Sequence, residues 1–445
     1  MTEISIYLIC IIAFISAIRL LSAPQTAVKG EYWATIGMLV AIFYAFLNFS
    51  HVPYKLIIAL FFGALIGFVS GRKIKISALP QMVAVFNGLG GGATVAVAIG
   101  EFLTLNSFSF ILPISILTGA VTFTGSLIAF GKLQGFILSE TNFKTVFNLL
   151  NPILALITFS LFAYFIINPE KEYFYILIFF ALLLGIALIL PINGADMPVV
   201  ISALNSLSGW ASVTIGFVQN NILMISVGTI VGASGTILTC FMAKAMNTAL
   251  SNFFYVRKTN IQKEREGSLT ARSGSPKDAA FIMENSQKII IVPGFGMAAA
   301  SAQHALKSMA DLLKNKYQVE VKFAIHPVAG RMPGHMNVLL AEANVDYNDI
   351  YELEDINRDF ATADVAYIIG ANDITNPEAQ NNPDSPLYGM PVFDVGQAKT
   401  VFFVKRTLGS GYSGTDNPLF FAPNTIMLYG DAKKITEEID KILEQ

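Results

Sequence analysis

The sequence predicts two parts: a polytopic α-helical membrane domain, then a soluble α/β domain built on a parallel sheet. Hydrophobic residues make up 54% of the 445 residues and the mean hydropathy is +0.58, far from a soluble average. Only 16 of the 60 charged residues lie in the first 243 positions. Towards the C-terminus, short β-rich runs alternate with amphipathic stretches, which is typical of a parallel sheet covered by helices.

The first half is predicted to cross a membrane about nine times, because a bilayer core requires about 20 apolar residues per helix. The first run is expected to be retained rather than cleaved as a signal, since Glu3 precedes it and Arg19 follows it, so it lacks the basic start of a signal peptide. The predicted spans lie near residues 3–21, 33–50, 54–70, 82–102, 108–130, 148–167, 173–190, 197–218 and 222–243.

Basic residues in the short connections predict the orientation, because cytoplasmic loops retain lysine and arginine. With the N-terminus outside, only Lys55 and Lys171 lie at outer ends. An odd number of spans then delivers the C-terminal domain to the cytoplasm. The basic residues that fall inside are Arg19, Lys29, Arg72, Lys73, Lys75, Lys132 and Lys144.

Charge and cysteine content exclude several classes of protein. The net charge is −2 and no basic cluster alternates with aromatic residues, so nucleic acid binding is not expected. Cys10 and Cys240 lack the spacing of a metal site or a disulfide framework. His326 and His335 are expected to shape a ligand site rather than to bind metal.

A polar stretch rich in glycine and serine predicts a linker over residues 257–287. It separates a membrane domain of residues 1–256 from a domain of residues 288–445, which is long enough for one fold. Strands are expected at 288–292, 319–325, 365–369, 400–404 and 426–428, with a closing helix over about 431–443.

The first expected strand runs into a Gly-x-Gly-x-x-Ala turn formed by Gly294, Gly296 and Ala299. Such a turn before a helix lets backbone N–H groups approach a pyrophosphate. In this setting it predicts a Rossmann-like domain that binds a dinucleotide. A tight turn without a ligand is the alternative.

The choice between NAD and NADP depends on groups near the adenosine ribose. An acid at the end of the second strand would favour a 2′-hydroxyl, but that strand ends in Ala324-Ile325-His326, which contains no acid. Lys405 and Arg406 end a later strand before a glycine-rich loop, and a paired ammonium and guanidinium suit a phosphate monoester. NADP is therefore favoured, unless the pair is only a solvated strand end.

These features, together with motifs along nearly the whole chain, resemble the beta subunit of the Si-specific/Re-face, proton-translocating NAD(P) transhydrogenases. Tyr412 follows the basic pair, and the remaining similar runs are residues 119–126, 194–200, 244–247, 326–338 and 370–373. The resemblance implies hydride exchange between NADH and NADP⁺, coupled to proton movement across a bacterial-type inner membrane.

The resemblance also implies a cofactor site and its roles. Gly294, Gly296 and Ala299 would lie along the pyrophosphate, in a cofactor reversed relative to the usual Rossmann arrangement. Arg331 would lie near cofactor phosphate, and Lys405 and Arg406 at the 2′-phosphate. Tyr412 would lie in a closing loop, and Asp373 near the nicotinamide. The expected binding residues are Gly294, Phe295, Gly296, Met297, Ala298, Ala299, Val328, Ala329, Gly330, Arg331, Gly370, Ala371, Asn372, Asp373, Lys405, Arg406, Gly411 and Tyr412.

The proton path of this chain is expected to differ from that of the proteins it resembles. Where many of them carry a histidine, this chain has Asn87, whose amide does not titrate near neutral pH. Asn87, Ser126, Asp196 and Asn221 are the main candidates, since polar groups within a membrane are often functional. Glu101, Asn205 and Asn220 are further candidates. Solvated loop positions, or for Ser126 a bond to its own helix, are the alternatives.

A partner is required by the chemistry. Hydride passes directly between two nicotinamides, so no catalytic side chain is expected. The reaction needs two bound dinucleotides, but the sequence shows only one phosphate-binding turn. NAD(H) is therefore expected on an alpha subunit or a pair of alpha-type chains, within a two-fold assembly, and no metal is expected. The rival hypotheses are a transporter or channel with a dinucleotide-sensing domain and a membrane-anchored NADP-dependent dehydrogenase.

Overall fold

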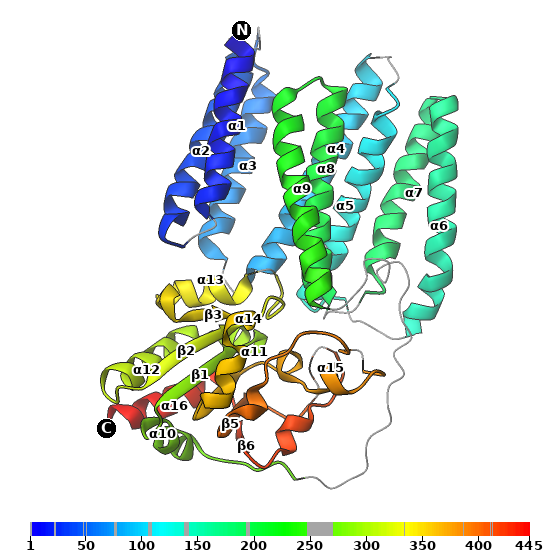
Figure 1. Cartoon of the computed structure of the whole chain (residues 1–445). Helices are drawn as coiled ribbons and strands as arrows, with labels where there is room; N and C mark the ends of the chain where they lie inside the picture. Colours follow the sequence, from blue (N-terminus) through cyan, green and yellow to red (C-terminus); the bar gives the residue numbers. More distant parts are fainter. Residues whose placement is uncertain are drawn as a thin grey trace. The chain divides into compact units, whose positions relative to one another are not determined.

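The computed structural model of the chain describes residues 2–21, 24–47, 49, 51–74, 78–105, 109–137, 142–192, 196–246, 270–332, 334–385, 387–409, 411 and 413–445. Contacts divide the chain into two compact units, Met1–Pro191 with Ala203–Ile237, and Ile192–Ser202 with Leu238–Gln445. The helices up to residue 246 and the domain from residue 270 are therefore described separately. Figure 1 shows the helices of the first part and the sheet and helices of the second.

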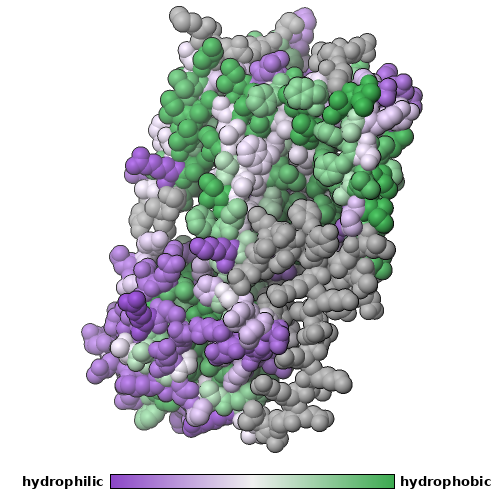
Figure 2. All heavy atoms as spheres, turned by 45° about the vertical axis from the view of Figure 1, so that its right-hand side comes forward, coloured by the Kyte–Doolittle hydropathy of each residue, from purple (hydrophilic) through white to green (hydrophobic). Residues whose placement is uncertain are grey.

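Within the described residues, nine helices are long and apolar enough to cross a membrane, which confirms the predicted number of spans, although the second begins nine residues earlier than predicted. Many of their large apolar side chains are exposed, as expected of surfaces that face lipid, and Figure 2 shows hydrophobic surface gathered over the helices. The helices are α1 (Thr2–Leu21), α2 (Pro24–Leu47), α3 (Tyr54–Lys73), α4 (Leu79–Leu105), α5 (Leu112–Leu133), α6 (Asn142–Ile167), α7 (Lys171–Ile189), α8 (Met197–Val218) and α9 (Ile222–Ala245).

Small residues let these helices approach one another closely. A β-carbon built on Gly91 of α4 would lie 2.8 Å from the backbone nitrogen of Phe123 in α5. On Gly228 of α9 it would lie 2.9 Å from the backbone nitrogen of Val213 in α8. Since lipid is as apolar as the side chains, such close packing is a main source of attraction between membrane helices.

The C-terminal domain is built on a six-stranded sheet whose paired strands are all parallel, in the order β3-β2-β1-β4-β5-β6. Most residues of the five strands other than β3 are buried, which explains their apolar runs. This confirms the predicted α/β class. The strands are β1 (Lys288–Pro293), β2 (Glu320–Ile325), β3 (Ile350–Glu352), β4 (Val365–Ile369), β5 (Thr400–Lys405) and β6 (Thr425–Tyr429).

Helices surround this sheet (Figure 1). The closing helix α16 has apolar residues Ile435, Ile439 and Leu443 on one buried face, and Asp431 caps its N-terminus by accepting from the Lys433 N–H. The longer helices are α10 (Pro276–Glu284), α11 (Phe295–Ala300), α12 (Gln303–Asn315), α13 (His335–Glu342) and α16 (Ala432–Glu444), and the short ones are α14 (Leu353–Ile356) and α15 (Glu378–Asn381).

The end of the segment predicted as a linker is structured. Ser275 and Asp278 form a capping box at the start of α10, which packs against α16. Just before it, Gly274 N–H donates to the Met427 carbonyl and Met427 N–H donates to the Arg272 carbonyl, at 3.0 and 2.7 Å. Residues 257–269 of the predicted linker lie outside the described residues.

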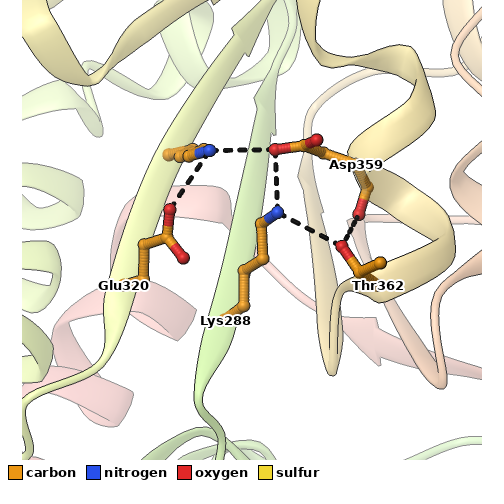
Figure 3. Close-up of polar contacts among 5 residues, drawn as sticks. Lys288, Glu320, Asp359 and Thr362 are labelled. Carbon is orange, nitrogen blue, oxygen red and sulfur yellow. Dashed lines mark hydrogen bonds and ion pairs between the residues drawn. The ribbon is translucent and has the colours of Figure 1, made fainter.

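Ion pairs tie the strands together at the amino edge of the sheet. Lys288 and Lys322 both donate to Asp359 Oδ2, at 2.7 and 2.9 Å, and Lys322 also contacts Glu320 at 3.1 Å (Figure 3). Hydrogen bonds from the two lysines hold the pKa of Asp359 below its usual range. The network joins β1 and β2 to the segment before β4, which leaves the opposite, carboxyl edge for a ligand.

Candidate nucleotide-binding site

The sheet has its topological switch point between β1 and β4. These strands pair in register up to Pro293 and Ile369, while the chain continues from β1 towards β3 on one side and from β4 towards β6 on the other. Open α/β sheets bind ligands outside the carboxyl ends of strands at such a point. The segments predicted from the sequence follow β1, β2, β4 and β5, so the fold brings them to one edge.

The turns after β1 and β4 are interlocked. Gly294 N–H donates to the Ile369 carbonyl at 2.9 Å, and Gly296 N–H donates to the Gly370 carbonyl at 2.8 Å. A β-carbon on Gly296 would lie 2.6 Å from Gly370 Cα, and one on Gly294 would collide with the Gly370 carbonyl oxygen. The glycines are thus required by contact between the two turns, and the Gly296 N–H is used inside the protein rather than directed at a pyrophosphate.

Several of the expected binding residues face the protein interior. Met297 and Ala298 in α11 are fully buried, and Ala329 and Ala371 nearly so. Ala299 is exposed. The side chains of the four buried residues serve packing, so any contact that they make with a ligand would come from the backbone.

The segment after β2 lies against the first turn. The guanidinium of Arg331 lies over the ring of Phe295, 4.0 Å from its centroid, which is a favourable cation–π contact. Arg331 N–H donates to His335 Nδ1 at 3.1 Å and Val328 N–H donates to His326 Nδ1 at 3.2 Å. These contacts place the arginine beside the Gly-x-Gly turn and fix the backbone around it.

The loop after β5 is attached to the segment after β4. Ser413 donates from its N–H and its hydroxyl to the carboxylate of Asp373, at 3.0 and 2.9 Å. A β-carbon on Gly411 would collide with the side chains of Asp373 and Asn372. Ser413 was not among the predicted residues, and only its place beside Tyr412 in the glycine-rich loop pointed to it. Tyr412 itself lies outside the described residues.

The two cations at the end of β5 have different environments. Lys405 Nζ donates to the Gly409 carbonyl at 2.7 Å and lies 4.4 Å from the centroid of the Phe420 ring. Its burial lowers the pKa of Lys405, which nearby Asp373 and Asp416 partly restore. Arg406 has 72% of its side chain exposed and pairs with Asp431 at 2.6 Å. One amine inside the loop and one exposed guanidinium suit an anionic ligand that reaches the edge from solvent.

In the membrane helices, Asn87 and Ser126 are both buried, in α4 and α5 respectively. Ser126 packs against Gly88, where a β-carbon would lie 3.2 Å from Ser126 Cβ. Within the described residues the Ser126 hydroxyl has no hydrogen-bond partner, so it is not bonded back to its own helix. A buried hydroxyl without a partner costs about 1–3 kcal/mol, which an ordered water would offset.

The other two main candidates, Asp196 and Asn221, lie at opposite ends of α8. Asp196 comes just before α8 and Asn221 follows its other end, so a helix of 22 residues, about 33 Å long, separates them. Asn221 Oδ1 accepts from the Met224 N–H at 3.1 Å and thereby caps α9, which already gives this side chain a structural role. In the described part of the chain, no three His, Cys, Asp or Glu residues are grouped as metal ligands.

The fold and this site define a multi-pass membrane protein that carries a Rossmann-type nucleotide-binding domain. The sequence model of the NAD(P) transhydrogenase beta subunit family matches residues 3–442. The chain is 47% identical to the NAD(P) transhydrogenase subunit beta of Rhodospirillum rubrum and to that of a named strain of the same species, over 97% of both chains. The chain therefore belongs to the NAD(P) transhydrogenase beta subunit family, whose role is hydride transfer coupled to proton translocation.

Proposed function

We propose that the carboxyl edge of the sheet binds NADP(H) and that this domain presents its nicotinamide to NAD(H) on an alpha subunit. The observation that carries the proposal is the position of Lys405 and Arg406 at the end of β5, one strand from the switch point. An ammonium and a guanidinium from neighbouring positions at the end of one strand supply several donors for a phosphate monoester, whereas a ribose hydroxyl needs none of that charge.

The residues present fit such a cofactor. Gly294, Gly296 and Gly370 have no side chains, and contacts between their turns exclude larger residues. No side chain from these positions therefore covers the edge at the switch point. Arg331, beside the first turn, supplies a cation for a phosphate, and Asp373 lies in the segment after β4. When bound, NADP⁺ accepts a hydride at its nicotinamide, and the protein residues bind and orient it.

The assembly and its orientation are part of the proposal. Since this chain has one phosphate turn, the NAD(H) domain belongs to the alpha subunit, as one chain or two, in a two-fold complex. The N-terminus lies outside a bacterial-type inner membrane and the nucleotide domain in the cytoplasm, because basic residues favour the inner connections. The membrane domain is then residues 1–256 and the nucleotide-binding domain residues 288–445, to which we add α10 for its packing on α16.

Binding measurements on the full-length chain test the cofactor assignment. The wild type is expected to bind NADPH far more tightly than NADH. Lys405→Ala and Arg406→Ala should each weaken NADPH binding about 10- to 100-fold, as expected for a charged hydrogen bond, and leave NADH binding unchanged. Lys405→Gln keeps an amide donor for Gly409, which separates the loss of charge from loosening of the loop.

A matched control is Lys399→Ala, which removes a 74% exposed lysine paired with Asp364 near the amino edge of the sheet. It should not change NADPH binding. A preference for NADH, or equal effects of all three alanine variants, would overturn the assignment and restore the sensor-transporter hypothesis.

We propose further that Asn87 and Ser126 lie on the proton path and order water there, rather than titrate. Asn87→Leu should lower proton-coupled transhydrogenation by the reconstituted complex at least about tenfold, because an apolar side chain interrupts a chain of hydrogen bonds. NADPH binding by the same variant should stay at the wild-type level. Asn87→His should retain coupling, and unchanged coupling in Asn87→Leu would remove Asn87 from the path.

A further inference from the structure

One carboxylate holds two elements together beside the basic pair. Asp431 follows β6, and its Oδ2 accepts from Arg406 Nη2 at 2.6 Å, across from the end of β5. Its other oxygen, Oδ1, accepts from the Lys433 N–H at 3.1 Å and caps α16. The Asp431 side chain is 30% exposed and that of Arg406 is 72% exposed. The aspartate is therefore fixed by the helix, and the arginine is fixed by the aspartate.

Charge and geometry leave Arg406 able to bind a second anion. The pKa of Asp431 is lowered, chiefly by its hydrogen bond from Arg406, so the carboxylate is ionised at neutral pH. A guanidinium carries five N–H donors in a planar fork, and this ion pair is made through Nη2. The other donors of an exposed side chain remain accessible to an oxyanion that approaches from solvent.

For an exposed arginine with no ion pair to restrict it, binding a ligand would cost up to about 2 kcal/mol in side-chain conformational entropy. The ion pair removes part of that freedom in advance. It also carries a cost, because the carboxylate repels a phosphate placed on the far side of the guanidinium. That repulsion is weakened by solvent and salt at so exposed a position, so the gain from fixing the arginine is expected to prevail.

We propose that Asp431 is a positioning residue for NADP(H) specificity, which holds the Arg406 guanidinium where it meets the 2′-phosphate. The inference rests on the proposed function, since it takes the basic pair as the 2′-phosphate site. The sequence carried a partial signal, because an aspartate directly before the closing helix is a typical N-cap. Its ion pair with the end of another strand could be seen only in the fold.

The test uses full-length Asp431→Asn, because asparagine caps a helix as well as aspartate does and removes only the charge. NADPH binding should weaken about three- to tenfold and NADH binding should not change. In an Arg406→Ala background the same substitution should have no further effect, which a merely structural role would not produce. Asp431→Asn should weaken the binding of adenosine 2′-monophosphate as it weakens that of NADPH, and it should not change the binding of adenosine 5′-monophosphate.

Asp364→Asn is the matched control. Like Asp431, Asp364 accepts a hydrogen bond from a backbone N–H, that of Gln287, and forms an ion pair, with Lys399. Unlike Asp431, it lies near the amino edge of the sheet. It should leave NADPH binding unchanged. If the wild type does not prefer NADPH, the proposed function fails. If it does, while Asp431→Asn binds NADPH equally or more tightly, or still weakens binding in Arg406→Ala, only the role of Asp431 is refuted.

Discussion

Replacing Gly370 with alanine is expected to destabilise the C-terminal domain by more than about 4 kcal/mol, which places it among the most damaging single substitutions. Gly370 has a φ of +68°, in the left-handed region, which alone costs another residue about 1–2 kcal/mol. In addition, the new β-carbon would collide with Gly296 Cα and the Met297 nitrogen, which are backbone atoms. The two interlocked turns would have to separate and break the bond from Gly296 N–H to the Gly370 carbonyl.

Gly334→Ala separates these two causes. Gly334 has nearly the same φ, +69°, but among the described residues a β-carbon there meets nothing within 4 Å. It should cost only the 1–2 kcal/mol of backbone strain. Hydrogen exchange of the β1 and β4 amides in the full-length protein would measure both losses. Equal effects of the two substitutions would mean that contact between the turns adds nothing to stability.

This interlocking explains what the sequence could and could not predict at the first turn. The Gly-x-Gly pattern after a buried strand correctly predicted a strand, a tight turn and a helix in α11. It did not indicate that Gly296 donates to Gly370, because that partner lies 74 residues further on and is set by sheet order. The predicted residues were brought together by topology, whereas the roles of individual N–H groups depended on tertiary contacts.

Elements that were missed had weak local signals. Strand β3 has three residues, of which none is fully buried, so it shows neither a long apolar run nor a clear alternation. Helix α10 lies in a polar stretch, although Ser275, Pro276 and Asp278 carry the signature of a helix start. Asn221 stays a candidate for the proton path, and its cap on α9 is a role that its place directly before an apolar helix could also have predicted.

The second large effect is expected from acid, through the two buried histidines that flank residues 327–334. His326 Nδ1 accepts from the Val328 N–H at 3.2 Å, and its Nε2 lies 2.7 Å from the Pro391 carbonyl oxygen, so the network assigns the proton to Nε2. His335 Nδ1 accepts from the Arg331 N–H at 3.1 Å. Both rings therefore have to be neutral, because protonation of Nδ1 would turn an acceptor into a donor that faces an N–H.

Burial lowers the pKa of each histidine from 6.5 to about 4, and the charge of Arg331 adds to the effect at His335. At pH values between these two pKa values, the histidines are protonated in the unfolded chain but not in the folded domain. The free energy of unfolding therefore falls as the pH drops from about 6.5 towards 4. At pH 5 the expected loss is about 2 kcal/mol for each histidine, relative to pH 7.5. The segment that positions Arg331 should then loosen before the sheet does.

Thermal unfolding of the full-length protein between pH 7.5 and pH 5, together with hydrogen exchange at Val328 and Arg331, would measure this loss. His326→Asn and His335→Asn keep a side-chain acceptor for the backbone N–H but do not titrate in this range, so each should remove its share of the pH dependence. His304→Asn, at an exposed position on α12, is the control and should leave the slope unchanged. A slope as steep in the double variant as in the wild type would assign the acid sensitivity to other groups. A reduced slope in these variants would mean that protonation of the two histidines causes the acid sensitivity.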